Sequence, residues 1–153
     1  MQNKGYDETT LSISQVAERL NISVETIRLY ERRGLVLTSK TEGNQRIFSE
    51  SDVERIECIR NAINEKKISI EGIRRMQSLI PCWKIVKCPG EQRDNCPAYV
   101  RTDAGCWTYA DKQKACLDRD CRSCKIYKLS GDCEQIKTLI YDNKSKKAKH
   151  SAD

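Results

Sequence analysis

Histidine is nearly absent from this chain of 153 residues, and the one copy, His150, lies in a lysine-rich C-terminal stretch. Apolar runs are short as well, and none approaches the roughly 18 residues that a membrane-spanning helix needs. A charged and then apolar leader, the mark of a secretory signal, is also missing. These absences argue against a membrane partner and lead us to expect a cytoplasmic protein.

The usual signals of enzymatic chemistry are missing too. The sequence has no glycine-rich phosphate loop, no cysteine with a plausible histidine partner and no carboxylate pair in a recognisable catalytic context. We therefore expect no enzyme activity.

The chain carries an excess of positive charge, but this excess is small in residues 1–80, the part with the predicted helix-turn-helix. The chain holds 28 Lys or Arg against 22 Asp or Glu, a net charge of +6, yet residues 1–80 hold 13 against 12. An anionic partner of this part would have to be bound by a few well-placed basic side chains, not by a general field.

Two short helices joined by a tight turn are predicted between residues 13 and 34. Ser12 and Gln15 fit the reciprocal cap in which each side chain satisfies a free backbone N–H. Asn21-Ile22-Ser23 has the length of the turn in a helix-turn-helix, and Ser23 can cap the second helix. Gly34 supplies the left-handed stop. The first helix places Val16, Ala17 and Leu20 on one face, and the second turns Ile27 inward and Arg28, Arg32 and Arg33 outward.

A wing and two further helices are predicted after this unit. The β-prone runs 35–37 and 46–48 flank a polar Gly43-Asn44 turn, which favours a two-stranded wing. Ser49 and Ser69 can cap the next two helices, and Pro81 ends the fourth helix after about three turns. Cys58, on the third helix, is expected to be a small buried apolar side chain.

Three stretches carry a family resemblance: residues 26–35 (Thr-Ile-Arg-Leu-Tyr-Glu-Arg-Arg-Gly-Leu), residues 43–49 (Gly-Asn-Gln-Arg-Ile-Phe-Ser) and Asp52-Val53. Together they resemble the DNA-binding domain of the MerR family of bacterial transcription regulators. Leu29 and the Thr-x-Gly-Asn wing resemble the heat-shock-repressor and glutamine-repressor branch of that family more than its metal sensors. The resemblance implies a winged helix-turn-helix over residues 11–80 and a homodimer on palindromic double-stranded DNA, with RNA polymerase as a further candidate partner. It implies DNA contacts by Gln15, Glu25, Thr26, Arg28, Tyr30, Arg33, Lys40, Asn44 and Arg46.

Within these implied contacts, Glu25, Thr26 and Arg28 would lie nearest the base edges or the adjoining backbone. Tyr30, Arg33 and Arg46 would hold phosphates, and the wing around residues 40–46 would follow the neighbouring groove. The metal-sensing members of the family continue into a long dimerisation helix, whereas Pro81 interrupts such a helix here.

Eight of the nine cysteines follow Pro81, within a segment that has few apolar residues. In a reducing compartment they favour metal or redox chemistry over disulfides. Cys121-Arg122-Ser123-Cys124 has the spacing of a chelating turn, and without a nearby histidine every candidate ligand is sulfur. All-thiolate sites suit an iron–sulfur cluster or zinc. The candidate ligands are Cys82, Cys88, Cys96, Cys106, Cys116, Cys121, Cys124 and Cys133.

The cysteine-rich segment contains two Cys-Trp pairs, Cys82-Trp83 and Cys106-Trp107, and a Cys-x-x-Cys-x-x-Tyr motif at residues 121–127. Over residues 81–128 this pattern resembles the two-CW cysteine-rich domain of bacterial signalling and regulatory proteins. That resemblance fixes no ligand. An iron–sulfur cluster is the leading prediction, because the aromatic neighbours could shield it from water and the spacing lacks the paired short gaps of zinc ribbons. Zinc and metal-free redox thiols remain open.

We therefore predict a mainly α protein with a mobile arm (1–10), a winged helix-turn-helix (11–80), a small irregular cysteine-rich domain stabilised by metal or cluster (81–133), and a short helix with a basic tail (134–153). The predicted function is a sequence-specific transcriptional regulator that senses redox or metal state. The alternatives are a constitutive DNA-binding protein with structural zinc, and an electron-transfer or thiol-redox module.

Overall fold

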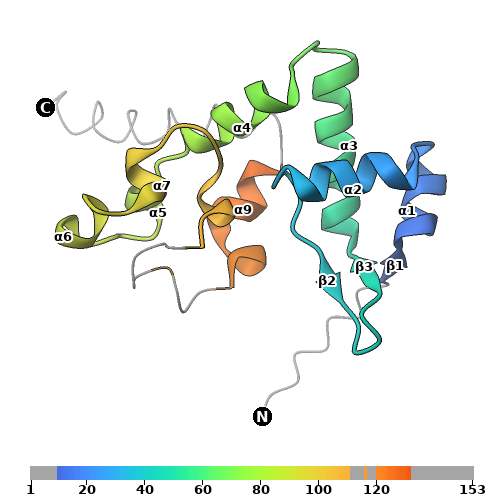
Figure 1. Ribbon diagram of the computed structural model, residues 1–153, viewed down its shortest axis with the longest axis horizontal. Helices are drawn as coiled ribbons and strands as arrows, with labels where there is room; N and C mark the ends of the chain where they lie inside the picture. The colour runs from blue at the N-terminus through green and yellow to red at the C-terminus, as the bar shows by residue number, and fades with distance from the viewer. Residues whose placement is uncertain (1–9, 111–115, 117–119, 132–153) are drawn as a thin grey trace, which may run out of the picture.

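The computed structural model describes residues 10–110, 116 and 120–131. The predicted N-terminal arm up to residue 9, Cys133, the short C-terminal helix and the basic tail lie outside these residues. Among the described residues no helix is long and apolar enough to cross a membrane. Helices dominate, and the winged unit and the cysteine-rich segment lie on opposite sides of Figure 1, with α9 (Lys125–Ser130) between them.

The predicted helix-turn-helix is present. Helix α1 (Ile13–Leu20) begins at the Ser12–Gln15 capping box, and helix α2 (Val24–Arg32) begins at Ser23, whose hydroxyl accepts from the Thr26 N–H at 3.1 Å. Asn21 ends α1 in the left-handed conformation with φ of 52°. Asparagine tolerates this conformation better than other residues with a Cβ, so the turn can be tight.

The wing differs from the prediction. Its sheet has the order β1–β3–β2, with β1 (Leu11–Ser12) and β2 (Ser39–Lys40) both antiparallel to β3 (Arg46–Phe48). The predicted strand at 35–37 is wrong, because that run forms a loop whose backbone groups bind the distant side chains of Arg55 and Tyr127. Strand β1 was not predicted, since two residues leave no periodic pattern.

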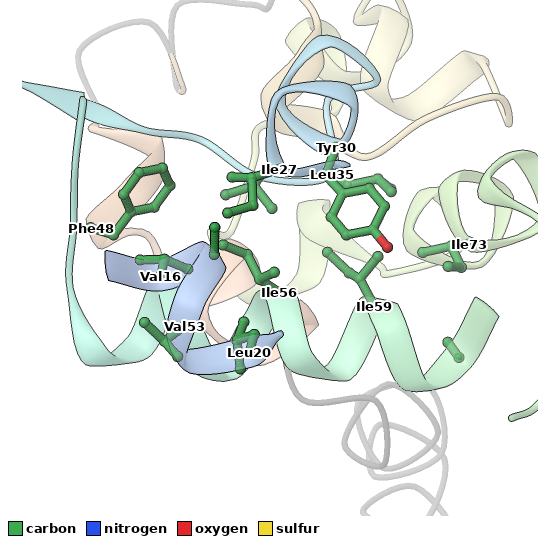
Figure 2. Close-up of a cluster of buried hydrophobic side chains, with 13 residues drawn as sticks. Val16, Leu20, Ile27, Tyr30, Leu35, Phe48, Val53, Ile56, Ile59 and Ile73 are labelled. Atoms are coloured by element: carbon green, nitrogen blue, oxygen red, sulfur yellow. The ribbon is translucent and has the colours of Figure 1, made fainter. Parts of the chain in front are cut away.

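Helix α3 (Glu50–Asn64) carries one side of the main core, and helix α4 (Ile70–Ser78) packs beside it. Figure 2 shows Val53, Ile56 and Ile59 of α3 pointing towards side chains of α1 and α2. The caps at Ser49 and Ser69 are confirmed, and α4 ends before Pro81 as predicted. One face of α2 therefore packs on α3 through the core, and the opposite face of α2 points away from the core.

The cysteine-rich segment consists of short elements around two small clusters. The first cluster packs Ile80, Cys82, Trp107, Ile126 and Tyr127, and the second packs Cys96, Ala98, Ala104 and Tyr109. The elements are α5 (Cys82–Ile85), α6 (Gly90–Arg93), α7 (Pro97–Val100), the 3-10 turns η1 (Cys106–Thr108) and η2 (Cys121–Ser123), and α9. Because the first cluster includes Leu37, this segment packs directly on the winged unit.

Candidate nucleic-acid interface

The outward face of α2 carries most of the predicted contact residues. Glu25 is exposed and Arg28 is partly exposed, and they form an i,i+3 ion pair at 2.8 Å. Thr26 is half-buried, and its hydroxyl lies 2.8 Å from the Ser23 hydroxyl at the cap. An exposed ion pair of this kind contributes little to stability, so either side chain can exchange its partner for another polar group.

Tyr30 does not lie on this face. It is 4% exposed, and Figure 2 shows its ring among the core side chains. Burial raises the pKa of its phenol. Because so little of its side chain is accessible, Tyr30 does not belong to the candidate interface.

Gln15 and Arg33 are both exposed but already have partners. The Gln15 side chain accepts from the Ser12 N–H at 2.8 Å, in the cap of α1. Arg33, directly after α2, forms an ion pair at 3.1 Å with Glu71 of α4. Its guanidinium is half exposed, so this pair too can open towards a negatively charged ligand.

Glu31 joins α2 to the wing, a role that the sequence did not reveal. Its carboxylate accepts from Arg46 Nε at 2.6 Å and from the Thr38 hydroxyl at 2.8 Å. Both partners of the Glu31–Arg46 pair are mostly shielded from solvent, which strengthens their attraction relative to an exposed pair. Arg46 thus fixes the wing against α2 in addition to lying on the candidate surface.

The tip of the wing presents Lys40 and Asn44, which are both exposed. Asn44 has φ of 63°, and its N–H donates to the Thr41 carbonyl at 2.9 Å. The predicted turn at Gly43-Asn44 is therefore present, although the left-handed residue is the asparagine. Together the exposed face of α2 and the wing tip form a surface with basic side chains at both ends, which we call the α2–wing surface: Glu25, Thr26, Arg28, Arg33, Lys40, Asn44 and Arg46.

The cysteines are only partly brought together. Cys82, Cys106, Cys121 and Cys124 all pack in or against the first cluster of the cysteine-rich segment. Cys96 belongs to the second cluster, while Cys88 and Cys116 are half-buried elsewhere. Among the described residues no three Cys, His, Asp or Glu side chains are arranged to hold a metal ion. Four of the eight predicted ligands therefore meet at one cluster, without the arrangement that a metal site needs.

Two thiols in this segment have shifted pKa values. A hydrogen bond from Cys106 lowers the pKa of Cys82, against the opposing effect of burial. Burial raises the pKa of Cys88, and the neighbouring thiols Cys96 and Cys82 add to that shift. Cys58 departs from expectation: it is half-buried and disulfide-bonded instead of being a buried apolar side chain.

Arg55 of α3 is a buried cation between the two parts of the chain, a role that no sequence pattern indicated. It is 3% exposed, and it donates to the Leu35 carbonyl at 2.7 Å and to the Tyr127 carbonyl at 2.6 Å. Its guanidinium lies 3.8 Å from the centre of the Tyr127 ring. Burial lowers the pKa of Arg55, and the phenol of Tyr127 counters part of that effect.

A second charged contact joins the cysteine-rich segment to the wing. Arg122, in the turn between Cys121 and Cys124, binds the carboxylate of Asp52 and the hydroxyl of Ser39 in β2. Asp52 is 3% exposed and also caps α3 through the Ser49 N–H. The cysteine spacing drew attention to this turn, but the arginine inside it carried no separate signal.

Comparison with known proteins finds similarity in the N-terminal part of the chain. Residues 11–79 match the family model described as MerR HTH family regulatory protein. The chain is 34% identical over 68 residues to the HTH-type transcriptional regulator ZntR of Escherichia coli, which is 44% of this chain and 48% of that protein. It is 44% identical over 68 residues to the HTH-type transcriptional regulator YfmP of Bacillus subtilis, or 44% and 46% of the two chains.

A third relative is the putative heat shock protein HspR of Streptomyces coelicolor, 30% identical over 74 residues, or 48% of this chain and 49% of that protein. The chain thus spans about half the length of the relatives it matches. The N-terminal half carries a MerR-family helix-turn-helix domain. The relatives do not single out the heat-shock branch of the family.

Proposed function

We propose that this protein is a sequence-specific DNA-binding transcriptional regulator that contacts double-stranded DNA through the α2–wing surface. The observation that carries the proposal is the outward face of α2, held to the wing by Glu31, within a domain matched by the MerR model. Helix α2 would enter the major groove and the wing would follow the next groove. The named relatives are regulators, which favours this role over enzymatic activity.

The side chains of this surface divide into two roles. Glu25, Thr26 and Arg28 lie in the first half of α2, where they would meet base edges. Arg33, Lys40 and Arg46 would contact phosphates, which position the protein without specifying sequence. The ion pairs of Arg28 and Arg33 are exposed, so phosphate or base acceptors can replace their carboxylate partners at small cost.

The proposal is tested by selecting bound duplexes from a random-sequence pool with the purified full chain, then measuring their affinity by fluorescence anisotropy. Arg28→Ala should weaken binding to the selected duplex by about 1–3 kcal/mol and relax the preference at one position. Lys84→Ala is the matched control, because Lys84 is an exposed cation on α5, in the cysteine-rich segment. Equal losses in the two variants, or a pool that yields no common sequence, would contradict the proposal.

The cysteine-rich segment is proposed to bind an iron–sulfur cluster or another thiophilic metal and to report redox or metal state. What supports this proposal is donor chemistry: four thiols pack in or against one apolar cluster that holds Trp107 and Tyr127, although the described side chains are not arranged as a metal site. Cys82, Cys106, Cys121 and Cys124 would hold it, and Cys88, Cys96, Cys116 and Cys133 are the remaining candidates. When bound, the group would add a centre whose charge or ligation can change.

Two alternatives remain for these cysteines. Structural zinc would make the protein a constitutive DNA-binding protein, whereas the hydrogen-bonded Cys82 and Cys106 favour a thiol-redox module. Iron, zinc and acid-labile sulfide measured on protein purified without air decide among them. Iron with sulfide supports the cluster, zinc alone supports the structural role, and neither metal supports the redox thiols.

We further propose a homodimer, as the MerR domain implies, acting on a palindromic site in the cytoplasm, with RNA polymerase as a candidate partner at the promoter. Palindromic half-sites in the selected duplexes would support the dimer. A single asymmetric site bound by one chain would contradict it.

A further inference from the structure

The loop of residues 34–37, which connects α2 to the wing, is held by distant side chains. Trp107 Nε1 donates to the Gly34 carbonyl at 2.7 Å, and the Leu37 N–H donates to the Tyr127 hydroxyl at 2.8 Å. Arg55 holds the Leu35 carbonyl between them. The backbone of this connecting loop thus finds in side chains the partners that a strand would find in a neighbouring strand.

Two of these three side chains come from the cysteine-rich segment and lie beside its thiols. Trp107 directly follows Cys106, and Tyr127 lies one helical turn after Cys124. Their rings meet edge to face, with centroids 5.3 Å apart, and the Arg55 guanidinium lies 5.0 Å from the Trp107 ring. Cys82, Cys106, Cys121 and Cys124 pack in or against the cluster that holds these two rings. A change of charge or ligation at the thiols therefore acts on the packing around Trp107 and Tyr127.

The packing leaves little room to absorb such a change. A Cβ at Gly34 would come within 2.6 Å of Thr108 Cγ2, and a Cβ at Gly105 would come within 2.4 Å of the Trp107 ring. Trp107 is 6% exposed and Tyr127 is 5% exposed. Closely packed interiors transmit displacement instead of damping it.

We propose that Trp107 and Tyr127 are positioning residues of the α2–wing surface: they fix the connecting loop, and through it they let the state of the cysteines set the spacing between α2 and the wing. This inference rests on the proposed DNA-binding function. Arg122 adds a second connection between the cysteines and the wing, because it joins the turn of residues 121–124 to Ser39 in β2.

The positioning role is tested first without DNA, by hydrogen exchange of the Leu37 amide in the full chain. Tyr127→Phe removes only the hydroxyl that accepts this N–H, so exchange at Leu37 should accelerate by about tenfold or more. Tyr109→Phe is the matched control: its hydroxyl donates to Asp103 within the cysteine-rich segment, 2.6 Å away. Unchanged Leu37 exchange in Tyr127→Phe, or an equal change in Tyr109→Phe, would overturn the positioning role.

The coupling is tested by a double-mutant cycle on affinity for the selected duplex. Cys124→Ser should change the dissociation constant by about fivefold or more, the low end of usual allosteric coupling. In the Tyr127→Phe background the same substitution should change it less than about twofold, because the connection is already lost. If Cys124→Ser does not fold, Cys106→Ser with Trp107→Phe forms the equivalent cycle.

Additive effects in the cycle, or no effect of the cysteine substitution alone, would overturn the coupling while leaving DNA binding intact. Failure of the wild-type chain to bind any selected duplex would instead overturn the proposed function. The Leu37 exchange result stands in either case, because it needs neither DNA nor a bound metal.

Discussion

Arg55 shows how a single charged residue can stabilise a junction between two parts of a chain. Its guanidinium is buried, yet it binds the carbonyls of Leu35 and Tyr127 and the hydroxyl of Ser130 at 2.9 Å. The aromatic faces of Trp107 and Tyr127 add cation–π attraction. These partners offset the cost of removing the charge from water.

Arg55→Ala should destabilise the protein by roughly 3 kcal/mol, since it leaves two buried carbonyls without a charged donor. The measurement is the midpoint of urea unfolding. Arg75→Ala, at an exposed arginine of α4, is the control and should stay within about 0.5 kcal/mol of wild type. A loss for Arg55→Ala no larger than that of the control would contradict the stabilising role.

The protonation of Tyr109 should make the folding stability of the protein depend on pH. Burial, reinforced by the hydrogen bond to Asp103, raises the pKa of Tyr109 from 10.0 to about 12. The folded state therefore keeps the phenol proton where the unfolded state loses it, so this stabilisation is complete below pH 10.0 and is lost as pH rises towards about 12. The stability advantage of wild type over Tyr109→Phe should shrink across that range, and a constant advantage would refute the assignment.

At the scale of elements, the sequence predicts what local chemistry decides. The capping residues Ser12, Ser23, Ser49 and Ser69 and the stop at Gly34 act within a few residues of themselves, so their spacing is sufficient to place α1 to α4. The same reasoning failed for residues 35–37. Their apolar, β-prone composition is explained by burial, and their hydrogen-bond partners lie 20 to 90 residues away.

The junction between α2 and the connecting loop is predicted to depend on Gly34. It has φ of 73°, which disfavours any Cβ, and a Cβ there would also clash with Thr108. Gly34→Ala should therefore cost about 1–2 kcal/mol from backbone conformation alone, plus the clash. Urea unfolding measures the loss.

Gly43→Ala is the control for this prediction, because a Cβ at Gly43 would meet its nearest atom at an ordinary 3.7 Å. Adding Thr108→Ser to Gly34→Ala removes the clashing methyl group and should recover part of the stability. No recovery in the double variant would mean that the backbone conformation alone accounts for the cost.

At the scale of the whole molecule, the sequence predicts only those residues of the candidate site that lie together on one helix or strand. The exposed face of α2 followed from its periodicity and its resemblance to a family. The joining roles of Glu31, Arg55, Trp107 and Tyr127 could not be predicted, because they arise from contacts between segments far apart in the sequence. For the same reason, the eight candidate cysteines could not be assigned to particular metal sites from the sequence: the spacing of cysteines does not say which thiols lie close together in the fold.

The most direct test of the account is the affinity of the intact chain for a selected duplex relative to a scrambled duplex of equal length, at physiological ionic strength. A sequence-specific regulator should prefer the selected duplex by about 10³-fold or more, because base contacts add to a shared phosphate contribution. Equal affinities that fall together as salt rises would mean that the basic side chains bind phosphate alone, and would contradict the α2–wing surface as a reader of DNA sequence.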